Sequence, residues 1–133
     1  MKITHRTLPV RIPAGEIHLN GDLTIAAKSA GLVIFVHGSG SSRFSSRNRH
    51  VAHVLNGAGF STLLADLLTG EEDALDALTA ELRLDIPMLA QRTMALIDWA
   101  SKDEAVSKFP IGLFGASTGA AAALLRRSNA RSS

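Results

Sequence analysis

The stretch FPIGLFGASTGAAAALL (Phe109–Leu125) decides the fold, because an apolar run stops at a short turn and resumes as an alanine-rich segment. The run before the turn is predicted to be a buried strand, and the segment after it a helix. Gly115 and Gly119 flank Ser117 at the spacing G-x-S-x-G. One serine is therefore expected to sit alone at a sharp turn between a strand and a helix.

This arrangement is typical of a nucleophile elbow, a turn so tight that its serine has a strained backbone and bulky neighbours would collide. Gly115 and Gly119 avoid those collisions, and the helix that follows directs its N-terminal N–H groups at the Ser117 oxygen. The same five residues would also occur in a glycine-rich turn that has no catalytic role or that binds phosphate. The strand before the turn and the helix after it favour Ser117 as a catalytic nucleophile.

A second motif ends another apolar run, in VIFVHGSGSS (33–42). A loop at this place is predicted to supply one half of an oxyanion hole through the backbone N–H of Ser39. The other half would be the backbone N–H of Thr118, the residue after the nucleophile. The residues that support this loop motif are His37, Gly38 and Gly40.

The glycines of the same loop also suggest a phosphate cradle. The pattern G-x-G-x-x-G fails because residue 43 is an arginine, and G-x-x-x-x-G-K-[ST] does not occur. The sequence thus favours an oxyanion site, while a phosphate- or nucleotide-binding α/β domain stays open as an alternative.

The rest of the chain predicts an α/β fold with an N-terminal β-hairpin, followed by parallel strands with flanking helices. Apolar and polar residues alternate on both sides of Pro13-Ala14-Gly15, as in a hairpin with one wet face. The continuous apolar run GLVIFV (31–36) indicates a buried strand, and FSTLLADLL (60–68) is predicted to be a second one. Helices are expected from about Ser46, and from Asp85 as an N-cap, and the acidic block between them is expected to be solvated.

Taken together, the two motifs and the segment between them resemble the dienelactone hydrolase-like branch of the α/β-hydrolases. The resemblance covers about residues 10–127 and matches the N-terminal half of that family's domain. It implies hydrolysis of a carboxylic ester, thioester or lactone by acyl transfer through Ser117, without a cofactor. Dienelactone hydrolase itself has a cysteine at the position of Ser117, so lactones are not singled out as the substrate.

The resemblance also implies a triad in the chain order Ser, then Asp or Glu, then His. Residues 118–133 contain none of these acids and no histidine. The chain is therefore expected to be one truncated domain, residues 1–133, and to be inactive as it stands. A non-catalytic binding or scaffold module that retains the fold is an alternative.

Four residues upstream of Ser117 are candidates to substitute for the missing base and acid. His37 and Asp66 are each expected to follow a strand at the same sheet edge as Ser117, and structural roles are favoured for both. His50 and His53, on the flanking helix, are weaker candidates for the base. The cluster Arg43, Arg47 and Arg49 either binds a substrate carboxylate or belongs to a solvated loop.

Composition limits the remaining possibilities. The chain of 133 residues has a net charge of +2 and no cysteine, which excludes disulfides and thiolate metal sites. It shows no leader and no apolar span, so a cytoplasmic protein is expected, with no nucleic-acid or membrane partner. Because the strand before Ser117 would lie at a sheet edge, self-association through that edge is also expected.

Overall fold

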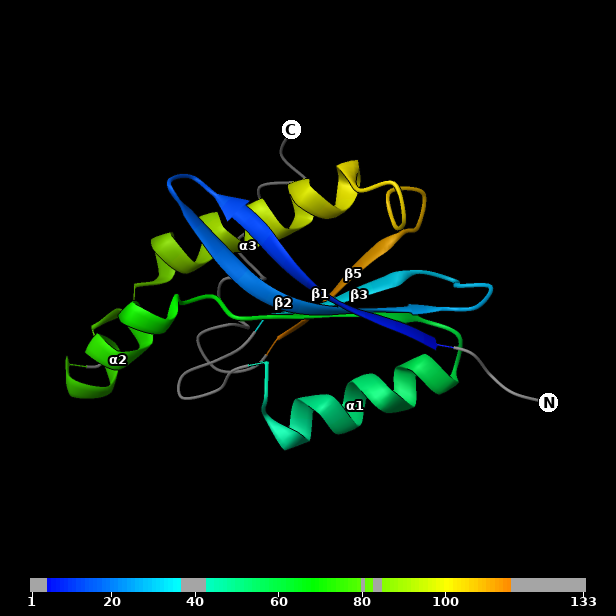
Figure 1. Ribbon diagram of the computed structural model, residues 1–133, viewed down its shortest axis with the longest axis horizontal. Coiled ribbons are helices and arrows are strands. Elements are labelled where there is room, and N and C mark those ends of the chain that lie inside the picture. The colour runs from blue at the N-terminus through cyan, green and yellow to red at the C-terminus, as the bar shows by residue number, and fades with distance from the viewer. Residues whose placement is uncertain (1–4, 37–42, 80, 83–84, 116–133) are drawn as a thin grey trace.

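A computed structural model of the chain shows a mixed five-stranded sheet with helices on both faces (Figure 1). The structure describes residues 5–36, 43–79, 81–82 and 85–115. The strands are β1 (His5–Ala14), β2 (Ile17–Ala26), β3 (Leu32–Val36), β4 (Ser61–Ala65) and β5 (Ile111–Gly115). The helices are α1 (Ser46–Gly57), α2 (Gly70–Thr79) and α3 (Ile86–Lys102).

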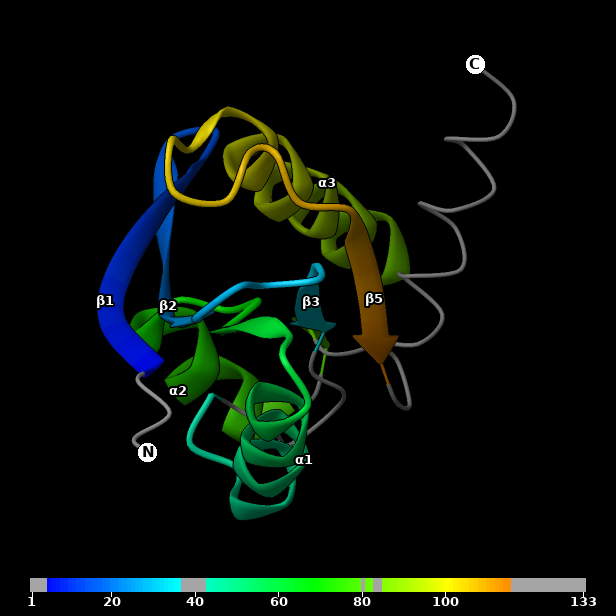
Figure 2. The same ribbon diagram turned by 90° about the vertical axis from the view of Figure 1, so that its right-hand side faces the viewer.

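The strand order is β1-β2-β4-β3-β5. Strands β3, β4 and β5 run parallel, whereas β2 pairs antiparallel with β4 and with β1. The predicted hairpin is confirmed, since β1 and β2 pair up to Ala14 and Ile17 around a turn in which Gly15 has a φ of +68°. Figure 2 shows β5 beside β3 at the outer side of the described sheet.

The carboxyl ends of the three parallel strands meet at one edge. Val36, the last residue of β3, is in register with Ala65 of β4 on one side and with Gly115 of β5 on the other. Loops that leave parallel strands at this edge form the binding sites of open α/β sheets. The predicted site residues therefore follow strands that end side by side.

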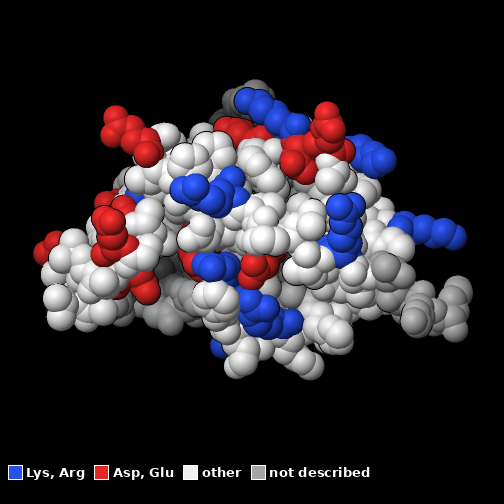
Figure 3. All heavy atoms as spheres, in the orientation of Figure 1, with Lys and Arg blue, Asp and Glu red and all other residues white. Residues whose placement is uncertain are grey.

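On the face shown in Figure 3, basic and acidic side chains of the described residues are interspersed, with acidic ones gathered at the end where α2 lies. Acidic residues Glu71, Glu72 and Asp73 make up the first turn of α2. No helix in the described part of the chain is long and apolar enough to cross a membrane.

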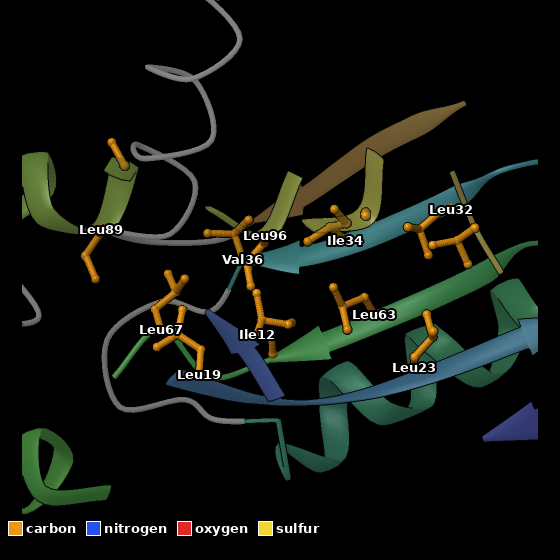
Figure 4. Close-up of a cluster of buried hydrophobic side chains, with 14 residues drawn as sticks. Ile12, Leu19, Leu23, Leu32, Ile34, Val36, Leu63, Leu67, Leu89 and Leu96 are labelled. Carbon is orange, nitrogen blue, oxygen red and sulfur yellow. The ribbon is translucent and has the colours of Figure 1, made fainter. Parts of the chain in front are cut away.

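Alternating residues of the parallel strands build two hydrophobic layers, one on each face of the sheet. Ile34 and Leu63 point to the α3 face and pack with Leu96, in the larger cluster drawn in Figure 4. Phe35 and Leu64 point to the other face and pack against Ala52 of α1. Because β4 is covered on both faces, all five of its residues are buried, including the polar Ser61 and Thr62.

Helices α1 and α3 both begin at a capped N-terminus, and the cap of α3 is the predicted one. Asp85 accepts a hydrogen bond from the Met88 N–H at 3.1 Å, and Pro87 follows in the first turn of α3. Ser45 caps α1 through the Asn48 N–H at 3.4 Å. The buried side of α3 agrees with the prediction. For α1, the helical spacing of Val51, Val54, Leu55 and Ala58 predicts the buried side only in part, since Val51 and Leu55 pack against the sheet while Val54 and Ala58 are exposed. Ala52 and Asn56 are buried there, whereas Val54 is 56% exposed.

Asn56 explains the different orientation of α1. Its side-chain amide donates to the Phe60 carbonyl at 2.9 Å and to the Thr62 hydroxyl at 3.2 Å, so the turn after α1 is fixed to β4. These two hydrogen bonds require Asn56 to face the sheet, and the helix turns Val54 toward solvent as a result.

The acidic segment that was expected to be solvated forms α2, and two of its carboxylates are not free. Glu72 makes a bidentate ion pair with Arg92 of α3, with 2.7 Å between Glu72 Oε2 and Arg92 Nη2. Arg92 also donates to the Leu67 carbonyl at 2.8 Å. Asp76 is buried and accepts from the Leu82 N–H at 2.8 Å. These contacts connect α2 to α3 and to the chain leaving β4.

The hydrogen bonds from Arg92 hold the pKa of Glu72 below its ordinary value of 4.5, against the opposing effect of burial. A lowered pKa in the folded state stabilises the fold above the unfolded pKa, and this contribution disappears as pH falls through the folded pKa. Stability from this pair is therefore present at pH 7 and lost in acid below about pH 4.5.

We expect Glu72→Gln to lower the free energy of unfolding at pH 7 by about 1–2 kcal/mol, because a charged bidentate pair is lost. The difference from wild type should shrink as pH falls below about 4.5. Urea denaturation at pH 7 and at pH 3 measures both values. Glu81→Gln, at an exposed carboxylate, is the matched control and should have little effect at either pH. A Glu72→Gln deficit that is the same at both pH values would contradict the role of the ion pair.

Candidate active site

Of the predicted site residues, the structure describes one, Gly115 of the elbow motif, at the carboxyl edge of the parallel strands. Gly115 is the last residue of β5, directly opposite Val36 of β3. The other seven residues of the predicted site lie outside the described residues: His37, Gly38, Ser39, Gly40, Ser117, Thr118 and Gly119. The described edge thus gives the points from which both predicted loops leave the sheet.

Asp66 and Arg43 interact at this edge. Asp66 follows β4 directly, and its Oδ1 accepts a hydrogen bond from the backbone N–H of Arg43 at 2.7 Å. Its Oδ2 accepts from the Arg43 guanidinium. The Asp66 N–H in turn donates to the Asn20 carbonyl of β2 at 2.9 Å. The structural role expected for Asp66 agrees with these contacts.

Asp22 on β2 adds a second carboxylate to the same group of charges. It accepts a hydrogen bond from Arg49 of α1 at 2.9 Å, and its Oδ2 lies 3.7 Å from Nε of Arg43. The guanidiniums of Arg43 and Arg49 lie 4.2 and 5.3 Å from the ring centroid of Phe44. These cation–π contacts and ion pairs join β2, the end of β4 and the start of α1.

These pairings decide between the two interpretations of the arginine cluster for two of its members. Arg43 and Arg49 bind carboxylates of their own chain, so they stabilise the edge and are not free to hold a substrate carboxylate. Arg47 lies on the exposed side of α1. Sequence reasoning missed Asp22, because an aspartate within an alternating strand gives no signal of an arginine partner distant in sequence.

The histidines that the structure describes do not form a metal site, since no group of three or more metal-binding side chains occurs among the described residues. His50 and His53 are exposed on α1. A cavity of about 490 Å³ lies instead between the β1–β2 turn and the second half of α3, where Trp99 and Asp98 line it. This cavity includes none of the predicted site residues.

Gly21 allows β2 to lie close to the end of β4. It pairs with Ala65, and a Cβ added at Gly21 would come within 3.2 Å of the Leu64 carbonyl oxygen and of a Leu63 methyl. A backbone atom cannot move away cheaply, so glycine is required for this approach. The approach places the next residue, Asp22, within reach of Arg43 and Arg49.

Comparisons with known proteins agree with this architecture, although no family model matches the chain. A dienelactone hydrolase from Anabaena variabilis superposes with a TM-score of 0.92 at 44% identity, over 96% of this chain and 59% of that one. The esterase Est1E from Butyrivibrio proteoclasticus is similar in fold, with a TM-score of 0.74 at 22% identity over 93% of this chain and 46% of that one.

The fold is therefore that of an α/β-hydrolase, matched over part of its length. Within that class, the likeness to the Anabaena protein relates this chain to the dienelactone hydrolase-like branch, as the motifs of the sequence indicate.

Two curated Mycobacterium tuberculosis proteins, from strains CDC 1551 and H37Rv, are 48% identical to this chain over 122 residues. Each is named "Putative phosphoribosyl transferase". The match covers 92% of this chain and 27% of each relative, so the chain spans about a quarter of their length. Most of each named protein lies outside the matched region.

We expect Gly21→Ala to lower the free energy of unfolding by about 1–3 kcal/mol, because the new methyl group overpacks against the β4 backbone. Gly112→Ala in β5 is the matched control, since a Cβ there meets no atom within 4 Å. Thermal denaturation of both variants measures the difference. Equal melting temperatures for the two variants would show that β2 and β4 can separate without cost.

Proposed function

We propose that the chain carries the nucleophile and oxyanion half of a serine hydrolase that acts on a carboxylic ester, thioester or lactone. The observation that carries the proposal is the likeness to a dienelactone hydrolase over 96% of this chain, at 44% identity. The strand register supports it, because Val36 and Gly115 end side by side and each leads directly into one of the two motifs.

In the proposed reaction, the Ser117 hydroxyl oxygen attacks the substrate carbonyl carbon while a general base removes its proton. The negative charge that develops on the carbonyl oxygen is stabilised by the backbone N–H groups of Ser39 and Thr118. Collapse of the tetrahedral intermediate expels the alcohol or thiol, which takes up the proton. Water then hydrolyses the acyl-serine in the same way and releases the acid.

The general base and its acidic partner are proposed to come from outside residues 1–133. Asp66 does not serve as the acid, since both of its carboxylate oxygens bind Arg43. The described histidines His50 and His53 are exposed on α1. A polypeptide that provides only these 133 residues should therefore bind the transition state weakly and lack proton transfer.

The name of the Mycobacterium relatives raises a second candidate, a phosphate-binding role in phosphoribosyl transfer. The region that matches this chain makes up only 27% of the protein that carries this name. The same region of this chain has a hydrolase fold at 44% identity to a dienelactone hydrolase. We therefore assign the hydrolase chemistry to the matched region and leave the transferase name to the rest of those proteins.

We expect the 133-residue chain to hydrolyse p-nitrophenyl acetate no faster than its Ser117→Ala variant, because an oxyanion hole alone leaves only about 10³-fold catalysis over water. A longer polypeptide that adds the acid and the histidine should show saturable hydrolysis that Ser117→Ala abolishes. Stopped-flow absorbance measures the rate of p-nitrophenyl acetate hydrolysis by both proteins and by their Ser117→Ala variants. Hydrolysis by the longer polypeptide that survives Ser117→Ala would overturn the proposal.

The oxyanion hole gives a geometric prediction. In a crystal structure with a phosphonate bound to Ser117, the Ser39 and Thr118 N–H groups should lie within about 3 Å of one phosphonate oxygen. Amides that diverge by several ångströms would favour a plain glycine-rich turn.

A further inference from the structure

Helix α2 turns a polar side toward the molecule and an apolar side toward solvent, the reverse of an ordinary surface helix. Asp76 is its one buried residue, whereas Leu75 and Leu78 are 54% and 86% exposed. A single exposed leucine is common on protein surfaces, so the informative feature is the carboxylate that is buried in place of two leucines. A ten-residue helix is also marginal by itself, and Leu78 adds almost no buried area to it.

Two polar contacts hold α2 in this orientation. Glu72 forms the bidentate ion pair with Arg92 of α3, and Asp76 accepts a hydrogen bond from the Leu82 N–H at 2.8 Å. Glu72 and Asp76 are four residues apart, so both lie on the same side of the helix. This side is fixed toward α3 and toward the chain after α2, and the side with the two leucines is turned outward as a result.

The exposed leucines lie in a surface of negative charge. Glu71, four residues before Leu75, is on the same side of α2, and we call Glu71, Leu75 and Leu78 the α2 face. Asp73 in the same helix and Glu81 just after it are exposed as well. Among the described residues, these three acidic side chains form no ion pair, and α2 contains no lysine or arginine. Figure 3 shows the acidic side chains gathered at the end of the molecule where α2 lies.

We propose that the α2 face binds a basic amphipathic helix of a partner protein. Apolar residues at i and i+3 of one helix pack against those of a second helix, and Leu75 and Leu78 have this spacing. The carboxylates near them favour lysine or arginine on the same partner helix and increase the rate of association. This proposal does not depend on hydrolase activity.

Charge also argues against other occupants of the α2 face. Two copies of the chain paired through this face would bring two acidic surfaces together, and like charges oppose such a contact. An anionic membrane or a nucleic acid would be repelled for the same reason. A ten-residue helix offers much less area than the roughly 800 Å² per partner of a stable interface, so the binding is weak and reversible.

The test measures how two helical peptides of about 18 residues bind the 133-residue chain, by fluorescence anisotropy at about 50 mM salt. One peptide has leucine on one side and lysine on the other, and the second has glutamate in place of every lysine. The chain should bind the lysine peptide at least about 10-fold more tightly, and this binding should weaken by about 3-fold or more at about 300 mM salt. Equal binding of the two peptides, or no binding of either, would overturn the proposal.

Substitutions at exposed positions, which the fold should tolerate, locate the bound peptide. Leu75→Gln combined with Leu78→Gln should weaken binding of the lysine peptide by at least about 10-fold, and Glu71→Gln by about 3-fold. Leu78→Gln alone should weaken it by at least about 3-fold and replaces the double variant if that variant unfolds. Val54→Gln is the matched control, because Val54 is 56% exposed on α1, and it should bind as wild type does. Full binding by the leucine variants, or an equal loss in Val54→Gln, would overturn the proposal.

The same proteins distinguish the other occupants. Self-association that light scattering detects in wild type and not in the leucine variants would indicate a second copy. Flotation with phosphatidylcholine vesicles that requires Leu78 would indicate a membrane. The longer polypeptide should bind the lysine peptide as tightly as the 133-residue chain does, and its failure to bind would show that the rest of that polypeptide covers the α2 face. Any of these three results would overturn the proposal and leave the proposed function intact.

Discussion

The parallel pairing of β3 with both β4 and β5 is the constraint on which the rest of the structure depends. Its register places Val36 between Ala65 and Gly115, so three strands end at one edge. The two glycine motifs follow directly from Val36 and Gly115. A shift by one residue in either pairing would turn the side chains of β3 to the wrong face, and the hydrophobic layers on both faces oppose such a shift.

Each hydrophobic layer therefore also fixes the strand ends from which the two predicted loops leave the sheet. Ile34 and Leu63 are buried on the α3 face, while Phe35 packs on the α1 side with its ring centroid 5.0 Å from that of Phe114. Phe114 immediately precedes Gly115, so this aromatic pair lies at the end of the strand that leads to Ser117. The charges of Asp22, Asp66, Arg43 and Arg49 then fix the same edge from its outer side.

Much of the fold could be predicted from the sequence because its signals are local. Apolar runs gave β3, β4 and β5, and the Asp85 cap gave the start of α3. The buried side of α1 was predicted correctly for Val51 and Leu55 but not for Val54, because the hydrogen bonds of Asn56 to Phe60 and Thr62 turn Val54 toward solvent. The Arg92 partner of Glu72 was also missed, since an ion pair between two separate helices leaves no mark in the residue spacing of either helix.

The candidate site, like the fold, has one part that could be predicted from the sequence and one part that could not. The motifs around Ser39 and Ser117 are recognisable from the sequence, because each needs small residues at fixed spacing. The contact between Asp66 and Arg43 depends on how β4 and the chain after β3 meet, and the sequence alone suggested only a structural role for Asp66. The likeness to a dienelactone hydrolase supports the predicted fold and extends over 96% of the chain, while the roles of Ser39 and Ser117 stay predictions.

The central claim is that Ser117 is the nucleophile, and mass-spectrometric mapping of a fluorophosphonate adduct tests it most directly. The reaction should be run on the longer polypeptide that contains residues 1–133, with Ser117→Ala as the comparison. The account predicts one phosphonylated residue, Ser117, and no adduct in the variant. Label on another residue, with Ser117 unmodified in a protein that hydrolyses esters, would contradict the account.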